Sequence, residues 1–485
     1  MILRPQKPAP LFATEVLRRL PLAEAFYALW GYVASDASLQ VLFATHRGKC
    51  YEDKLSFAEL VAVLADALTR YHGRGRGAIL DAIARQQLSC QARAVYGKLQ
   101  RLPLPLAQAF LSDLTARLRP LFPAAAYQTA LPARLARLAV VVIDGKKIKK
   151  AAKRLLATRG QPGKLFGGKI LAAYLPAEGL VVAVAADPDG EANDVRLLPP
   201  LLPLARQAVA GPRLWVADRQ FGDLEQPRRF AEQGDHFLIR YSKHTSFHPD
   251  PDRPACVGTD EQGRTVCQEW GWLGAPGQGT RRVAVRRITL QRPGQEAVAL
   301  VTDLSDEQMY PAADLLAVYR SRWQIENCFQ QITEVFDLRY LIGSTPEATV
   351  FQASVCLLMY NMLQLIRGYV AVGQAQPVQA ATLSSEMIFV DVRKALIGLH
   401  EVLRVEELLE GLSGIPVTVA QMQERLRGLL GGLWSARWKK AVNKKPRPHK
   451  VKAKQSGAHT SVHKLLQKAK QTKREKDKSP SKSPQ

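Results

Sequence analysis

The stretch that decides the fold is LAVVVIDGKK, residues 138–147, in which an apolar, β-branched run ends at Asp144. Such a run, bounded by turn residues, predicts a short buried strand. A second run, LWVADR at residues 214–219, repeats the pattern and ends at Asp218. Each predicted strand therefore ends in a carboxylate. The structural alternatives are a turn residue for Asp144 and a surface ion pair with Arg219 for Asp218.

The elements around these two runs follow one order along the chain. The predicted elements are strands at 138–143, 169–174 and 180–185, an irregular helix after Asn193-Asp194, a strand at 214–217, a helix at 223–233 and a strand at 236–241. This is the order of the ribonuclease H-like fold, in which one acid lies on the central first strand and another just past the fourth. Asp144 and Asp218 hold those places. The predicted class is α/β, with a ribonuclease H-like catalytic core.

Charge is the strongest compositional signal. The chain has 485 residues, a formal net charge of +25 and 47% hydrophobic residues, which excludes a wholly disordered chain and predicts a polyanionic partner such as nucleic acid. The last 49 residues hold 17 Lys and Arg against two acidic residues. No apolar run is expected to span a membrane, no signal peptide is expected, and six scattered cysteines are expected to be reduced thiols. These features predict a cytoplasmic protein.

Shifts in pattern along the chain predict a core with additions at both ends. Residues 85–99 fit a helix-turn-helix and an ordinary helical bundle equally well. The predicted units are a helical N-terminal DNA-binding region (1–130), the first part of the core (131–241), a β-rich insertion (242–295), the second part of the core (296–372), a C-terminal helical region (373–434) and a disordered basic tail (435–485).

A third acid lies on a predicted helix that runs from about Asp306 to Leu338. In YRSRWQIE, residues 319–326, the spacing places Tyr319, Arg322 and Glu326 on one helix face. Asp144, Asp218 and Glu326 are therefore the candidate catalytic residues and ligands of two Mg²⁺ ions, with Mn²⁺ as a substitute, because hard divalent cations prefer carboxylate oxygens.

Each of these assignments has a competitor. Glu326 could instead form an ordinary helix pair with Arg322. Asp187, Asp189 and Asp194 compete as ligands, although Asp194 is expected to cap a helix.

The ordered blocks resemble a family, the DDE transposases of the insertion-sequence 4 (IS4) type. Tyr319, Arg322 and Glu326 match its Tyr-x₂-Arg-x₃-Glu signature, and residues 141–145, 191–195 and 217–221 resemble its blocks around the two aspartates. The family's lysine, seven residues after the glutamate, is replaced here by Thr333.

The resemblance implies metal-dependent DNA cleavage and strand transfer by a cut-and-paste route. The implied partners are the terminal inverted repeats of an element and its target DNA, bound by a homodimer in a synaptic complex in the bacterial nucleoid. Tyr319, Arg322, Lys146 and Lys147 are the expected DNA contacts. Trp270 or Trp272 could stack on a flipped base, or could simply pack the insertion. A catalytically inactive or domesticated DNA-binding derivative, or a ribonuclease H-like nuclease, are the alternatives.

Overall fold

A mixed β-sheet forms the centre of the protein. The computed structural model describes residues 10–127, 131–149, 151–275, 282–292, 294, 296–338, 340–403, 418–440 and 459–478. The first five strands lie in the order β3–β2–β1–β4–β5. β1 is parallel to β4, and β4 to β5, whereas β2 is antiparallel to β1 and β3. Their bounds are β1 Ala139–Lys149, β2 Leu165–Leu175, β3 Leu180–Asp187, β4 Arg213–Ala217 and β5 His236–Arg240.

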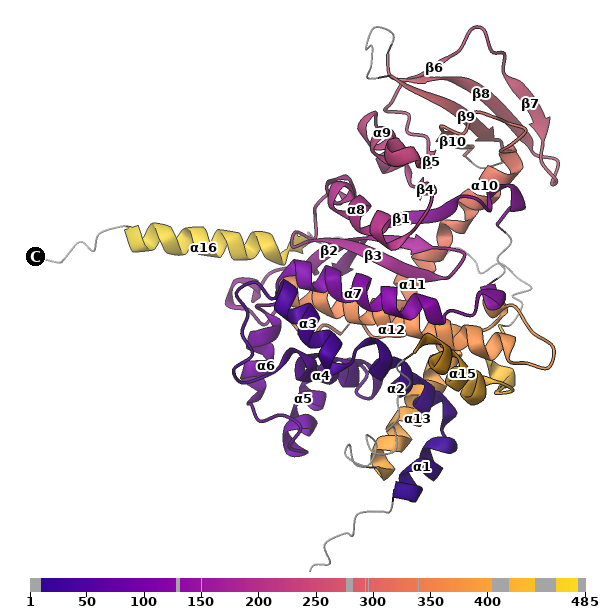
Figure 1. Cartoon of the computed structure of the whole chain (residues 1–485). Coiled ribbons are helices and arrows are strands. Elements are labelled where there is room, and N and C mark those ends of the chain that lie inside the picture. Colours follow the sequence, from indigo (N-terminus) through magenta and orange to yellow (C-terminus); the bar gives the residue numbers. More distant parts are fainter. Residues whose placement is uncertain are drawn as a thin grey trace, which may run out of the picture.

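Both faces of this sheet are covered by helices, as Figure 1 shows. Val140 and Val142 of β1 belong to the core on one side, whereas Val141 and Ile143 belong to the core on the other. A strand that is buried on both faces has no polar alternation, which is why residues 138–143 read as a continuous apolar run. α8 (Leu198–Ala208) and α9 (Glu225–Ala231) cover one face, and α7 (Leu104–Leu118) and α12 (Pro346–Val372) the other.

The N-terminal helices share a hydrophobic core with α12 and the sheet. The Ser56 side chain and Glu59 form a reciprocal capping box that begins α4. The helices are α1 Pro10–Arg18, α2 Pro21–Val33, α3 Asp36–His46, α4 Phe57–Thr69, α5 Gly75–Ala84 and α6 Ala92–Leu99. The helical character expected before residue 130 is therefore confirmed for the described residues.

The predicted β-rich insertion extends the central sheet. Beyond β5 the strand order continues as β10–β9–β8–β6, with β7 paired to β8. The strands are β6 Phe247–Pro249, β7 Cys256–Thr259, β8 Thr265–Leu273, β9 Val283–Leu290 and β10 Val298–Thr302. Trp270 is 5% exposed. Its Nε1 donates to the Ser305 carbonyl at 2.9 Å, and Arg253 lies 3.8 Å from its ring centroid, so Trp270 packs the insertion.

The long helix predicted from Asp306 to Leu338 is shorter and interrupted. The Asp306 carboxylate accepts bonds from the backbone N–H groups of Gln308 and Met309, which forms a separate turn. α10 (Ala312–Ser321) begins only after Pro311, its N-cap, whose ψ of 144° is not helical. The helix is interrupted at Arg322, and α11 (Trp323–Glu334) ends before Asp337, whose φ is +55°. The predicted ends were therefore wrong, whereas the helix that carries Glu326 was correct.

α12 corrects the expectation that no segment is apolar enough to cross a membrane. By length and hydropathy it meets that test, but its most apolar window is 94% buried inside the protein. Its N-terminus is capped by the Thr345 side chain. The helices that follow are α13 (Ser385–Val402) and α15 (Val419–Leu430).

The prediction of disorder from 435 to 485 is wrong for residues 459–478. β11 (Thr460–Ser461) pairs in parallel with the start of β2, and α16 (Val462–Lys478) follows it. Composition alone missed this because only a few residues of the segment are buried, among them Val462. Trp438 also packs, and its Nε1 donates to Asp391 at 2.7 Å. Residues 441–458 and 479–485 of the predicted tail lie outside the described residues.

Candidate active site

Asp144 lies where β1 outruns its parallel neighbour β4. β1 pairs with β4 only as far as Val142, but it continues along β2 to Lys149. Asp144 is therefore inside the strand, opposite Ala172, and not after it as the sequence had predicted. Its Oδ1 accepts a bond from the Gly145 N–H at 2.8 Å. The side of Asp144 that faces β4 is free of strand pairing.

Asp218 is the first residue after β4. β1 and β4 run parallel and pair as far as Val142 and Val216, so Asp144 and Asp218 each lie two residues beyond the last pair, at the same edge of the sheet. Asp218 caps a short 3₁₀ turn, and its Oδ1 accepts from the Arg219 backbone N–H at 2.6 Å. That contact is made by the backbone of Arg219, which differs from the surface ion pair considered as the alternative.

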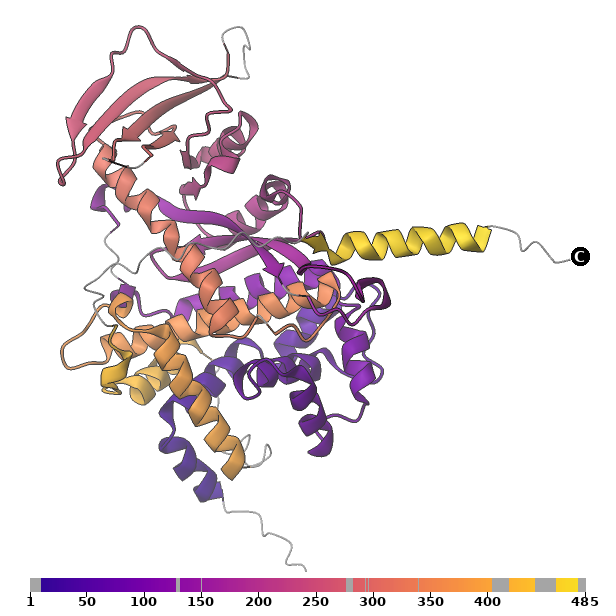
Figure 2. The same ribbon diagram turned by 180° about the vertical axis from the view of Figure 1, so that it is seen from behind.

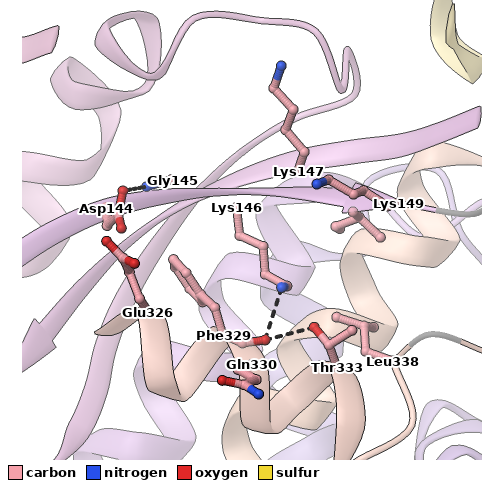
Figure 3. Close-up of a pocket in the computed structure, with 11 residues that line it drawn as sticks. Asp144, Gly145, Lys146, Lys147, Lys149, Glu326, Phe329, Gln330, Thr333 and Leu338 are labelled. Atoms are coloured by element: carbon pink, nitrogen blue, oxygen red, sulfur yellow. Dashed lines mark hydrogen bonds between the residues drawn. The ribbon is translucent and has the colours of Figure 1, made fainter. Parts of the chain in front are cut away.

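Glu326 reaches the same region from α11. Arg322 bridges two of the acids, since its Nη1 lies 3.4 Å from Asp144 Oδ2 and its Nη2 lies 2.8 Å from Glu326 Oε1. The i,i+4 ion pair between Arg322 and Glu326 is therefore present, and Arg322 also contacts Asp144 of β1. Asp144 and Glu326 both line a cavity of about 710 Å³, and Figure 3 shows their carboxylates facing one another.

Tyr319 completes the helix face predicted from the sequence. The Arg322 guanidinium lies 6.0 Å from its ring centroid. Burial raises the pKa of Tyr319 to about 12, with the positive charge of Arg322 opposing and the negative charge of Asp218 adding to the shift. Tyr319, Arg322 and Glu326 therefore all face the ends of β1 and β4.

Asp194 lies next to the candidate site, and the role predicted for it from the sequence was wrong. It was expected to cap a helix, but Asn193 accepts the capping bond from the Val195 N–H. Asp194 is buried, pairs with Lys169 of β2 and accepts from Gln220 Nε2 at 2.6 Å. A Cβ on Gly145 would lie 2.2 Å from Asp194 Oδ1, so a larger residue here would displace the Asp194 carboxylate, which pairs with Lys169. The feature of the sequence that could have indicated this ion pair is Lys169, a lysine inside an otherwise apolar strand.

Burial and neighbouring acids perturb the Asp144 carboxyl. Burial raises its pKa to about 6; Arg322 opposes this shift, and Glu326 and Asp194 add to it. Ionised Asp144 is thus disfavoured when no cation other than Arg322 is near. A bound cation would reverse that preference.

A pH dependence of stability follows from this shift. Because the pKa of Asp144 is raised on folding, its contribution is fully present near pH 4 and is lost as the pH rises through about 6. Asp144→Asn resembles the protonated form. In EDTA it should therefore raise the free energy of unfolding by up to about 3 kcal/mol at pH 8, with little difference at pH 4. Denaturant unfolding at the two pH values measures this. A variant less stable than wild type at pH 8 contradicts it.

The donor set fits a hard divalent cation, although the acids are not drawn together as a ligand cluster. Among the described residues, no group of three or more His, Cys, Asp or Glu side chains is placed to hold a metal ion. The Arg322 guanidinium lies instead between Asp144 and Glu326 and supplies positive charge there. Asp144, Asp218 and Glu326 are the carboxylates that would hold the ion, because oxygen ligands suit Mg²⁺ and Mn²⁺.

The two predicted DNA-contacting lysines point in different directions from β1, as Figure 3 shows. Lys146 points into the cavity, where its Nζ donates to the Phe329 carbonyl at 3.0 Å, and burial lowers its pKa to about 8. Thr333 Oγ1 donates to the same carbonyl at 2.7 Å. Lys147 is exposed and lies 5.4 Å from the Phe166 ring centroid. The Lys146 ammonium therefore lies beside the position where the resembled family carries its lysine.

Asp144 and Glu326 flank an arginine at one end of a mixed sheet, and the neighbouring strand β4 is followed by a third acid, Asp218. Acids in such positions are typical of enzymes that act on phosphodiesters with the help of metal ions. Comparisons with known proteins agree with this class. Residues 136–362, which include all three acids, match the family model described as the transposase DDE domain. This match supports a DDE transposase.

Two curated relatives carry names of the same kind. The chain is 27% identical over 93 residues to "Putative transposase y4zB" of Sinorhizobium fredii, across 19% of this chain and 25% of that protein. It is 24% identical over 165 residues to "Probable transposase for insertion sequence element IS5377" of Geobacillus stearothermophilus, across 33% of this chain and 41% of that protein. The chain thus spans less than half the length of either relative.

Proposed function

We propose that the protein is the transposase of an insertion sequence of the IS4 type, which binds terminal inverted repeats and moves its element by cut-and-paste. The observation that carries this proposal is the contact of Arg322 with both Asp144 and Glu326, with Asp218 directly after β4, the strand parallel to β1. The strand order β3–β2–β1–β4–β5, with β2 antiparallel to its neighbours, supports a ribonuclease H-like core.

The chain's own groups would bind and position the DNA. When bound, two Mg²⁺ ions would activate the attacking water or 3′-hydroxyl and stabilise the leaving oxygen. Arg322, freed from the two carboxylates, offers a planar donor fork to a backbone phosphate next to the scissile bond. The Tyr319 hydroxyl is protonated at neutral pH, as tyrosines are, and burial extends this state by raising its pKa to about 12, so it can donate to the same phosphate. No protein nucleophile is required.

The substrate in this proposal is double-stranded DNA, both the ends of the element and its target. Two ends must be held together for excision, so the active form is a homodimer in a synaptic complex. The net charge of +25 supports a nucleic-acid partner. The compartment is the bacterial cytoplasm, at the nucleoid.

Lys146 takes the place of the family's lysine in this proposal. Lys146→Gln should lower single-turnover cleavage about tenfold or more, because a charged contact to phosphate near the cut is lost. Lys147→Gln, the matched control on the opposite side of β1, should change the rate less than about threefold, as expected for an exposed contact. Equal effects of the two substitutions would contradict the assignment of Lys146 to the cavity.

The proposal is tested with a supercoiled plasmid that carries the DNA flanking the coding sequence. Mg²⁺-dependent cuts at defined ends, followed by joining to a new site, support a transposase. Binding without cutting supports the runner-up, an inactive or domesticated derivative, which Thr333 favours. Cutting without preference for the ends indicates a ribonuclease H-like nuclease.

A further inference from the structure

α16 is a strongly basic helix that leaves the body of the protein. Figures 1 and 2 show it projecting from the sheet, away from the helices around α7 and α12. Its 17 residues hold seven Lys and Arg against two acidic residues, and span about 25 Å at the helical rise. From Lys468 to Glu475 every side chain is exposed. The apolar residues of its first turns, Val462, Leu465 and Leu466, pack against the protein's own core, and from Lys468 onward the helix has no large apolar side chain with which to pack against another protein.

The base of α16 is nevertheless firmly fixed. β11 pairs with Leu165 and Phe166 of β2, and Ser461 and Val462 are 0% exposed. Lys464 forms ion pairs with Glu191 and with Asp189, the second at 3.7 Å. The direction of the helix is therefore set by the central sheet.

The same edge of the sheet joins α16 to the candidate active site. Phe166 pairs with β11 on one side and with Lys149 of β1 on the other, and its ring lies under Lys147. Lys147 and Lys149 are exposed and lie on the strand that carries Asp144. Lys147 and Lys149 thus lie across one residue of β2 from the strand that starts α16, and the further exposed lysines of the helix, beyond the paired Lys464, begin at Lys468.

The charges on α16 repel one another while the helix is free. Lys470 has Lys473 and Arg474 as its neighbours three and four residues on, and like charges at those spacings destabilise a helix. Most short helices also need packing to be stable in water, which α16 lacks beyond its first turns. A polyanion along the helix would relieve this repulsion.

We propose that α16 is a DNA-binding arm that lies along the phosphate backbone of the duplex bound at the active site, outside the region of the cut. This rests on the proposed function for the identity of the duplex. The contact depends on charge and not on base sequence, because the contacting side chains are lysines and one arginine on a helix that projects from the protein.

The test measures duplex affinity of the full chain by fluorescence anisotropy in EDTA, over about 50 to 200 mM salt. Lys468→Gln, Lys470→Gln and Lys473→Gln are combined in one variant. The slope of log K against log salt concentration should become shallower by about 2 to 3, because each phosphate contact contributes about 0.9 to that slope. The loss should be equal for element ends and for a duplex of arbitrary sequence.

A matched control removes the same charge elsewhere, with Lys394→Gln, Arg427→Gln and Lys439→Gln, all exposed and on the helical side of the molecule. Its salt dependence should change by less than about 1. Wild-type salt dependence in the α16 variant would overturn the proposal. So would normal DNA binding with loss of self-association by light scattering, which would make a second copy the partner.

The experiments give different results when the DNA-binding role of α16 is wrong and when the proposed transposase function is wrong. Binding in EDTA requires neither metal nor cleavage. If the wild-type protein does not cleave DNA but the α16 variant has a shallower salt dependence, the proposed enzyme activity is wrong and the DNA-binding role of α16 stands. Normal cleavage with unchanged salt dependence rejects the arm alone. A wild-type chain that binds no duplex rejects both.

Discussion

Asp144→Asn should lower metal-dependent cleavage of element ends by about a thousandfold while leaving duplex affinity in EDTA unchanged. The amide keeps the shape of the side chain and can still accept the bond from the Gly145 N–H. It removes the negative charge that a divalent ion would meet at the edge of β1. A thousandfold loss corresponds to about 4 kcal/mol of transition-state stabilisation, within what a metal site supplies.

Single-turnover cleavage at saturating Mg²⁺ is the measurement for this first prediction. Glu334→Gln is the control, because Glu334 is exposed, lies on the same helix as Glu326 and accepts a bond from Gln330 Nε2 at 3.0 Å. Its rate should stay within about twofold of wild type. The increase in stability expected for Asp144→Asn at pH 8 excludes unfolding as the cause of the lost activity. Cleavage at the wild-type rate would remove Asp144 from the mechanism.

Asp235→Ala should give the largest loss of stability in the core, about 3 to 5 kcal/mol. The Asp235 side chain is 0% exposed and lies 2.9 Å from Arg213 Nη1 and 3.0 Å from Arg206 Nε. It also accepts from Trp215 Nε1 at 3.1 Å. Without the carboxylate, the largely buried Arg213 guanidinium loses its charge partner, and Arg206 keeps the partly exposed Glu232 at 3.4 Å. This cost exceeds that of a simple cavity because the charges stay buried.

Guanidinium chloride unfolding of wild type and variant measures this second effect. Asp252→Ala, at an exposed position in the insertion, is the matched control and should change the free energy of unfolding by less than about 0.5 kcal/mol. A loss below about 1 kcal/mol for Asp235→Ala would mean that the network contributes little. The network matters for the site because Arg213 begins β4, and the other end of that strand carries Asp218.

The sequence was sufficient to predict the order of the strands and the helix that carries Glu326. Both predictions depend on local patterns. Residues 138–143 are apolar on successive positions because β1 is buried on both faces, and the spacing of Tyr319, Arg322 and Glu326 matches one helical face. That Asp144 and Asp218 lie at the same edge of the sheet follows from the parallel pairing of β1 and β4.

What the sequence could not predict depends on contacts between distant residues. The bridge from Arg322 to Asp144 joins residues 178 positions apart, and the pairing of Asp194 with Lys169 turned an expected cap into a buried ion pair. α16 was missed because its composition is that of a solvated chain. Its attachment depends on β11 and a few buried side chains, which leave almost no pattern in the sequence.

Asp218→Cys tests most directly the proposal that Asp144, Asp218 and Glu326 hold one set of metal ions. A thiolate is a poor ligand for Mg²⁺ and a better one for softer metals such as Mn²⁺. End cleavage by Asp218→Cys should therefore be lost in Mg²⁺ and partly restored in Mn²⁺, whereas Asp218→Ala should stay inactive in both. Full activity of Asp218→Cys in Mg²⁺, or the same loss in both metals, would contradict a metal-binding role for Asp218.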